Sequence, residues 1–570
     1  MSQQELEIVV GMGLSRRAIM RLIAGASAAS VAGITPVAAG FARAQDEMPA
    51  DMAESQVLRV GSGSTGVASF TFTPLQGGGD QQNWQTLQWV PPMYFDIDLN
   101  LQPGTFSEWS SNADGTEWTF TVDPNAKFSD GSALTAADVK GTWELMATPT
   151  TEHGRIVGYI GKIEGFTEFR EGTATEISGL QASDDGTVTV KLIAPDPAFA
   201  SRIATTHMNV VKAEQAKAAP TEFWKPENNP AVSGPYVLTA YDPDAGTAEL
   251  APNPNWWKED GPYLEKIEFR FVPEQQVLGA LVQNGEIDVS LAPLPVELMS
   301  AVPDYFRPIK AFGFNTFWFN VGHAPTDEVA VRKALTLAVN FDDVFAAAYP
   351  IAEGVANRAT QIVDQDFTCV DETNTWYVQD IEGAKAALAE STYKTADALP
   401  KLRVTPRAEY PPLQRALETI IEAWRQNLGI VNVEYKARPD EFGPDVDKLN
   451  VSRDDVVIRF PDTATYMWAA GYSTGPVASA GSNPASDMLG GYNNPELDKL
   501  IDEALTLAVD DPKRCELALQ AQSIFMHDYT CMPFAEEVMT LNAREYVVNY
   551  LKGPDVTLIE PWKIYLGKQG

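Results

Sequence analysis

The chain has 570 residues, of which 44% are apolar and 21% are charged, and its formal net charge is −35. This length exceeds what one ordinary hydrophobic core serves, so we expect two or three lobes. The composition is typical of a soluble globular protein. The large negative charge argues against nucleic acid and anionic lipid surfaces as partners.

The first 44 residues differ from the rest and predict an export signal. The pair Arg16-Arg17 precedes an Ala- and Gly-rich apolar run, and the Ala-Arg-Ala of residues 42–44 fits an A-x-A cleavage site. The Ser-Arg-Arg context is typical of twin-arginine signals, which are addresses and not anchors. The alternative is a retained membrane helix over Leu22–Phe41, which is weakly apolar. We expect cleavage after Ala44 and a periplasmic mature protein.

After the signal, short strands alternate with helices. Thr116–Val122 and Thr187–Ile193 alternate apolar and polar residues, as half-buried strands do. Leu134–Ala147 is predicted to be a helix, with Thr135 as its N-cap and Asp138 completing a capping box.

The second half of the chain shows the same alternation. An amphipathic helix beginning at Pro411 is followed by a strand near Val433, and two further helices open with Asn494-Pro495 and Asp511-Pro512. Helices interleaved with strands predict an α/β architecture with mixed sheets.

The cysteines and histidines indicate no metal or catalytic centre. Cys369, Cys515 and Cys531 show no CxxC or Cys/His spacing, so we predict neither a metal nor a cofactor. At most one intrachain disulfide can form among them. The four histidines are scattered, and the G-x-S-x-G and HExxH motifs are absent. A secreted hydrolase stays open as an alternative, because 77 acidic residues could include a catalytic carboxylate pair.

Several stretches follow one another in a characteristic order. They are Ala126–Met146 with an F-S-D-G…L-T-A-x-D-V core, Ser233–Trp257 with G-P-Y and N-P-N-W-W, Tyr263–Val289, Phe314–Val344 and, more weakly, Gly490–Ala504. Together they resemble the family 5 extracellular solute-binding proteins of ABC importers, a group that contains dipeptide-, oligopeptide- and nickel-binding proteins. The resemblance covers essentially the whole mature chain.

That resemblance implies a periplasmic-binding-protein-like fold of type II, in which two lobes of discontinuous chain enclose a ligand cleft beside an extra domain. The expected first lobe comprises residues 45–91, 220–320 and 531–570. The expected extra domain is 92–219, and the expected second lobe is 321–530. In such a fold the ligand binds between the lobes, which close about a hinge.

A stretch late in the expected second lobe, Val457–Pro476, bears on the ligand. Peptide-binding members of the family read roughly W-x-A-D-Y-P-D-P here, and their first aspartate pairs with the α-ammonium group of the peptide. Matched on the Pro-Asp pair, this chain has Arg459 in that place, followed by Asp462. An arginine there favours a carboxylate or phosphate on the ligand. The alternative is an internal ion pair of Arg459 with Asp462 or Asp455.

Aromatic walls with few polar anchors give a solute pocket affinity without strict shape. Rings in the same stretch and elsewhere are therefore predicted to contact the ligand, with core packing as the alternative interpretation for each. The predicted ligand-binding residues are Arg459, Asp462, Tyr466, Trp468, Trp84, Trp89, Phe317 and Phe319.

The function expected from the resemblance is that of a periplasmic receptor and not of an enzyme. It would capture a peptide or peptide-like solute by lobe closure. It would act as a monomer and deliver the solute to ABC permease subunits in the inner membrane, which work with a cytoplasmic ATPase. Because the amine-binding aspartate is missing and tryptophan is plentiful, an oligosaccharide or an anionic, opine-like conjugate stays open as the ligand.

Overall fold

The computed structural model describes residues 49–570, apart from residues 64–72, 75–79, 99, 150–155, 293, 295–297, 309–312, 351–355, 364–366, 368, 372, 374–375, 407–410, 454–455, 458–461, 474, 476, 478–488, 538–539, 554–556 and 569–570. Residues 1–48 form a separate unit, so the predicted signal over residues 1–44 lies outside the described residues. Pro49–Gly570 form the other unit. Among the described helices, none is long and apolar enough to cross a membrane.

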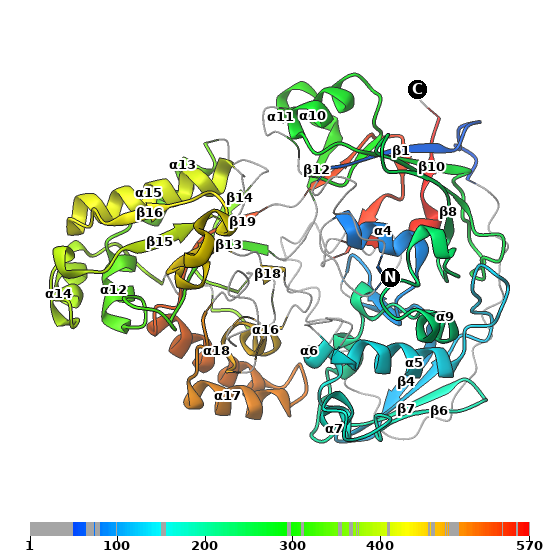
Figure 1. The fold of residues 1–570 in the computed structure, drawn as a ribbon, viewed down its shortest axis with the longest axis horizontal. Coiled ribbons are helices and arrows are strands. Elements are labelled where there is room, and N and C mark those ends of the chain that lie inside the picture. Colours follow the sequence, from blue (N-terminus) through cyan, green and yellow to red (C-terminus); the bar gives the residue numbers. More distant parts are fainter. Residues whose placement is uncertain are drawn as a thin grey trace, which may run out of the picture. The chain divides into compact units, whose positions relative to one another are not determined.

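The first sheet takes strands from distant parts of the chain (Figure 1). Its order is β12 (Phe306–Pro308), β20 (Thr540–Ala543), β11 (Val289–Ser290), β1 (Val57–Ser62), β10 (Lys266–Phe271), β9 (Thr247–Pro252) and β8 (Tyr236–Asp242). The three central strands are parallel, and antiparallel strands flank them on both sides. Apolar residues of β1, β9 and β10 share one core with residues of the C-terminal segment.

The second sheet is also mixed. Its order is β14 (Ala356–Arg358), β19 (Cys531–Glu537), β13 (Gly313–Phe319), β17 (Val451–Arg453), β15 (Leu402–Thr405) and β16 (Val433–Tyr435), and β18 (Val456–Val457) also pairs with β13. Four helices contribute to its core, namely α12 (Val329–Leu337), α13 (Phe341–Ala348), α14 (Ile381–Glu390) and α15 (Pro411–Leu428). α15 is the predicted amphipathic helix, and the indole of its Trp424 donates to the carbonyl of Leu335 at 2.7 Å.

Three more helices form a second core beside this sheet. They are α16 (Thr463–Gly471), α17 (Pro495–Leu505) and α18 (Pro512–His527). Asn494 and Asp511 cap α17 and α18 and a proline follows each cap, as predicted. Trp318 of β13 belongs to this core, whereas Phe317 and Phe319 belong to the other one, because successive side chains of a strand point to opposite faces.

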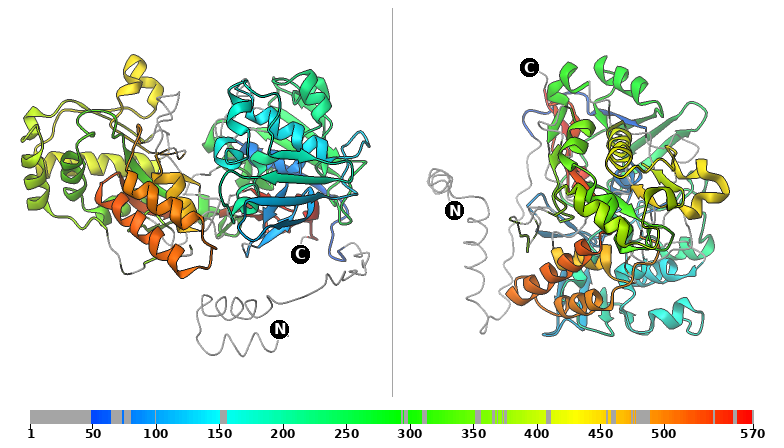
Figure 2. Two further views of the ribbon diagram at one scale, coloured as in Figure 1. Left: turned by 90° about the horizontal axis from the view of Figure 1, so that it is seen from below. Right: turned by 90° about the vertical axis from the view of Figure 1, so that its left-hand side faces the viewer.

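A separate four-stranded antiparallel sheet lies within the expected extra domain (Figure 2). Its order is β4 (Phe106–Ser111), β5 (Glu117–Val122), β7 (Thr187–Lys191) and β6 (Leu180–Ala182), and α5 (Ala136–Ala147) packs on it. Both predicted strands and the predicted helix are therefore present. The capping box is confirmed, since the Thr135 side chain accepts from the Asp138 amide and the Asp138 carboxylate accepts from the Thr135 amide.

The other described elements are short. They are α4 (Asp80–Gln88), α6 (Ile156–Ile160), α7 (Phe166–Arg170), α8 (Phe199–Arg202), α9 (Ala213–Ala218), α10 (Gln275–Gln283), α11 (Leu298–Ala301), the 3-10 helices η2 (Thr206–Met208), η3 (Pro226–Asn228), η4 (Pro303–Tyr305), η5 (Ala396–Ala398), η6 (Pro439–Lys448) and η7 (Pro561–Lys563), and the strand pairs β2 (Met93–Phe95) with β3 (Leu101–Pro103), β21 (Val547–Val548) with β24 (Tyr565–Leu566), and β22 (Leu551–Lys552) with β23 (Leu558–Ile559).

The strand pairing moves two of the expected lobe boundaries. The boundaries at residues 320 and 530 placed β13 and β19 in the first lobe, yet these strands pair with each other in the second sheet. Their side chains explain the difference, because Phe317 stacks on Phe534 at 5.5 Å in the core of that sheet. The chain therefore passes between the two sheets after β12 and again between β19 and β20.

Candidate functional site

The centre of the candidate site is α16, the helix that begins inside the stretch singled out by the sequence. Asp462 is its N-cap, and its Oδ2 accepts from the amide of Thr465 at 2.9 Å and from the hydroxyl of Thr465 at 2.6 Å. These bonds satisfy donors that a helix start leaves without intrahelical partners. The position of α16 is thus fixed at its first turn by one carboxylate.

The same carboxylate forms a buried ion pair. Nη2 of Arg514, from α18, lies 2.5 Å from Oδ2 of Asp462, and the Arg514 side chain is 0% exposed. Nη1 of Arg514 donates to the carbonyls of Ala504 and Leu507 at 2.9 Å each, at the end of α17. Burial raises the pKa of Asp462, but the hydrogen bond and positive charge of Arg514 outweigh it, so this pKa lies below its ordinary value. Asp462 therefore connects the three helices of the second core.

Arg459, the residue predicted to face an anionic ligand group, lies outside the described residues. Its contact with a ligand therefore stays a prediction. Its possible ion pairs with Asp462 and Asp455 are likewise untested, although Asp462 has Arg514 as a partner.

Tyr466 and Trp468 lie on opposite sides of α16. Residues two apart in an α-helix are separated by about 200° of rotation. Tyr466 accordingly is buried in the second core, edge-on to Phe367 with a centroid distance of 6.1 Å, and burial raises the pKa of its hydroxyl. Trp468 is only half-buried: it packs against the same core and also reaches outward to the extra domain.

Trp468 contacts the extra domain. The guanidinium carbon of Arg202 on α8 lies 5.2 Å from the centroid of its ring. The Cη2 atom of the ring lies 3.1 Å from where a Cβ on Gly158 of α6 would be. In Figure 1, α6 and α16 are the elements that meet at this contact.

The other predicted rings are buried in cores. Phe317 and Phe319 are 0% exposed in the core of the second sheet. Trp84 on α4 is also 0% exposed; its Nε1 donates to Gln88 at 2.6 Å, and it packs edge-on against Phe269 of the first sheet. These placements match the core-packing interpretation of the three rings.

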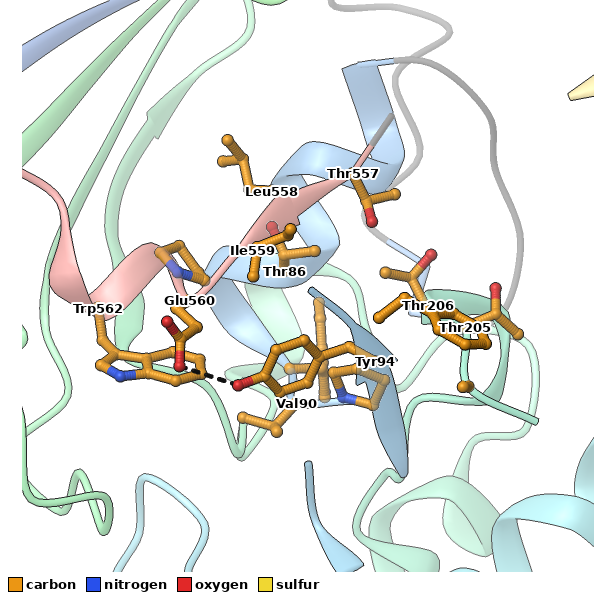
Figure 3. A pocket seen from close by; sticks show the side chains of 15 residues that line it. Thr86, Val90, Tyr94, Thr205, Thr206, Thr557, Leu558, Ile559, Glu560 and Trp562 are labelled. Atoms are coloured by element: carbon orange, nitrogen blue, oxygen red, sulfur yellow. Dashed lines mark hydrogen bonds between the residues drawn. The ribbon is translucent and has the colours of Figure 1, made fainter. Parts of the chain in front are cut away.

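Trp89 lines a small internal pocket between α4, η2 and the C-terminal β23–η7 segment (Figure 3). The cavity has a volume of about 30 Å³, which suits a water molecule and not a peptide. Tyr94 donates to Glu560 at 2.9 Å across this pocket. Burial and then the charge of Glu560 raise the pKa of Tyr94.

Two comparisons with known proteins place the chain. The sequence profile of the bacterial extracellular solute-binding proteins, family 5, matches residues 100–477, more than half of the chain. The chain belongs to this family. The oligopeptide-binding protein OppA of Bacillus subtilis is 25% identical over 483 residues, which cover 80% of this chain and 83% of that protein. The dipeptide-binding protein of Escherichia coli is 26% identical over 79% of this chain and 84% of that protein.

Solved structures of similar proteins share the fold. Haemophilus influenzae OppA, crystallised in complex with the peptide RPPGFSPFR, superposes with a TM-score of 0.76 at 20% identity, over 91% of this chain and all of that one. The murein tripeptide-binding protein MppA of Escherichia coli superposes with a TM-score of 0.77 at 20% identity and the same coverage. The expected type II solute-binding fold is therefore present.

The family profile describes solute-binding proteins. In the part of the chain that the structure describes, no three His, Cys, Asp or Glu residues are grouped so as to hold a metal ion. No disulfide joins Cys369, Cys515 and Cys531 to one another. α16 and its neighbours combine a half-buried indole, that of Trp468, with a buried ion pair.

Three residues of this region are not among the predicted ones, namely Arg514, Arg202 and Gly158. Arg514 lies 52 residues after Asp462, and no local spacing rule connects them. The one usable signal was Asp462 itself, because an Asp directly before a helix marks an N-cap.

Proposed function

We propose that this family 5 protein is the receptor of an ABC importer and that it captures a peptide between its two lobes. The family match over residues 100–477 carries the proposal. It is supported by relatives named as binding oligopeptides, dipeptides and tripeptides, with which the chain aligns over about four fifths of its length.

The mechanism is lobe closure without covalent chemistry. The two sheets are connected by two chain passages, from β12 to β13 and from β19 to β20. Two short connections allow rigid lobes to rotate about a hinge. A ligand that contacts both lobes binds the closed form more tightly, and it shifts the population of the two forms by that difference in affinity.

A specific observation favours a second candidate ligand. Arg459 stands where peptide-binding relatives carry an aspartate for the α-ammonium group, and an arginine suits an anionic group. The structure of AgaA in complex with agropinic acid superposes with a TM-score of 0.72 at 15% identity. The second candidate is therefore an anionic conjugate of the opine type, bound in the same place as the peptide.

The cellular setting follows from the same proposal. The signal over residues 1–44 would send the protein through twin-arginine export to the periplasm, where it would work as a monomer. There it would deliver its ligand to inner-membrane permease subunits coupled to a cytoplasmic ATPase. A relative from Salmonella typhimurium, 25% identical over 80% of this chain, is named a periplasmic oligopeptide-binding protein.

A thermal-shift screen tests the ligand. The protein is heated with di- and tripeptides, N-acetylated tripeptides, opines, oligosaccharides and nickel, and a ligand of the folded state raises Tm by mass action. The proposal expects a shift from free peptides, whereas the second candidate expects one from opines alone. Mass spectrometry of each hit after incubation separates the receptor from a hydrolase, because a receptor returns its ligand intact. Turnover of a hit, or no shift from any peptide or opine, would contradict the proposed function.

A further inference from the structure

The extra domain presents a socket to the second lobe, and Trp468 occupies it. We define the socket by Gly158 on α6 and Arg202 on α8. At position 158 a Cβ would lie 3.1 Å from Cη2 of Trp468, closer than ordinary van der Waals contact, so the missing side chain makes room for the indole edge. Gly158 has no positive φ, so its backbone conformation does not explain the glycine. The space it leaves for Trp468 does.

Arg202 is fixed by polar contacts within the extra domain. Its Nη2 lies 2.7 Å from Oδ2 of Asp196, with side-chain exposures of 5% and 1%, and its Nη1 donates to the carbonyl of Gly158 at 3.5 Å. Its Nε is buried and has no hydrogen-bond partner in the described part of the chain. A buried guanidinium gains from the electron-rich face of an indole. The Trp468 ring, 5.2 Å away, supplies that face from the other lobe.

Charged side chains of both signs lie beside the socket. Lys162, which follows α6, is partly buried. Burial and the positive charges of Arg202 and Arg514 lower its pKa, while Asp196 and Asp502 act in the opposite direction. Asp502 belongs to α17, so opposite charges of the extra domain and the second lobe are close enough to interact. Asp502 is in turn bonded to Tyr472 at the end of α16, with 3.0 Å between the hydroxyl and Oδ1.

From this geometry we infer that Trp468 is a latch that docks into the Gly158–Arg202 socket and stabilises the closed arrangement of the second lobe against the extra domain. The latch is a positioning device and contacts no ligand. Loss of the docked indole shifts the population toward the open form. The inference rests on the lobe closure of the proposed function, but not on the identity of the ligand.

The first test needs no ligand. Small-angle X-ray scattering of the full-length protein compares the wild type with Trp468→Leu, which removes the indole, and with Gly158→Val, which fills the socket. The controls are Trp109→Leu, which removes a half-buried indole from β4 of the extra domain, and Val157→Leu, which adds bulk at an exposed position of α6. We expect Trp468→Leu and Gly158→Val to have a larger radius of gyration than the wild type. The two control variants should have the same radius as the wild type. An unchanged radius in both Trp468→Leu and Gly158→Val, with circular dichroism showing that they are folded, overturns the latch.

The second test uses trialanine and N-acetyl-trialanine as probes in stopped-flow binding. Removal of a cation–π contact of this kind should weaken binding roughly 3- to 30-fold, mainly through faster dissociation. Equal dissociation rates in the wild type, in Trp468→Leu and in Gly158→Val overturn the latch. If the wild type binds neither probe, the thermal-shift screen decides the peptide proposal, and the scattering experiment still decides the latch.

Discussion

The ion pair between Asp462 and Arg514 gives the sharpest stability prediction. Asp462→Asn keeps a side-chain oxygen at the N-cap, and asparagine caps helices about as well as aspartate. The substitution therefore removes the negative charge and leaves the 0%-exposed Arg514 guanidinium unpaired. Breaking one partner of a buried pair costs about 3–5 kcal/mol. We expect the free energy of opening of α16, α17 and α18 to fall by about that amount.

Hydrogen–deuterium exchange with peptide resolution measures that free energy for these helices alone. Asp510→Asn, at an exposed position between α17 and α18, is the matched control and should change exchange little. The double variant Asp462→Asn/Arg514→Met removes both charges and should recover much of the loss, because a paired charge and a packed apolar side chain cost similar amounts. A loss below about 1 kcal/mol, or a double variant no more stable than the single one, would refute the reasoning.

The pH dependence of the same pair has a definite sign. The pKa of Asp462 in the folded protein lies below its ordinary value of 3.8. Its contribution to stability is therefore fully present above pH 3.8 and is lost as pH falls through the lower folded pKa. In an acid titration followed by circular dichroism, the stability difference between the wild type and Asp462→Asn should be constant near neutrality and shrink in strong acid. A difference that changes between pH 5 and 8 would contradict this assignment.

Three further predictions concern other sites. Burial lowers the pKa of Lys258 to about 8, so in urea unfolding the stability of the wild type should rise relative to that of Lys258→Met as the pH increases from 8 to 10. Thr135→Ala should destabilise α5 by about 1 kcal/mol in hydrogen exchange, because it removes half of a capping box; the exposed Thr173→Ala should not do so. Arg459→Ala should abolish the Tm shift given by an acidic ligand and leave the unliganded Tm unchanged; a large drop in unliganded Tm would indicate an internal ion pair instead.

Local features of the fold could be predicted because they depend on neighbouring residues. The caps of α5, α17 and α18 were predictable, since a cap and its acceptor lie within a few positions. The strands β5 and β7 were predictable for a similar reason, because the alternation of their side chains follows directly from the pleat.

The sheet to which each strand belongs could not be predicted from neighbouring residues. The apolar run of β13 fits any buried strand, and only its pairing with β19, more than 200 residues later, assigns it to the second sheet. The burial of Trp84, Phe317 and Phe319 could not be predicted for the same reason. An aromatic ring suits a core and a ligand wall equally well, and its place depends on which residues the rest of the fold packs against it.

The two roles of α16 illustrate why a residue list from sequence mixes different functions. Asp462 and Trp468 are six residues apart, or about 9 Å along the helix axis. The first is bound to Arg514 inside the second lobe, and the second reaches Arg202 in the extra domain. Their substitutions should therefore have separable effects. Asp462→Asn should loosen the three-helix core and accelerate its exchange, whereas Trp468→Leu, which removes one partly buried ring packed against that core, should disturb it less and alter the arrangement of the lobes. If both variants produced the same exchange pattern, α16 would not act as a rigid connection between an internal anchor and an external contact.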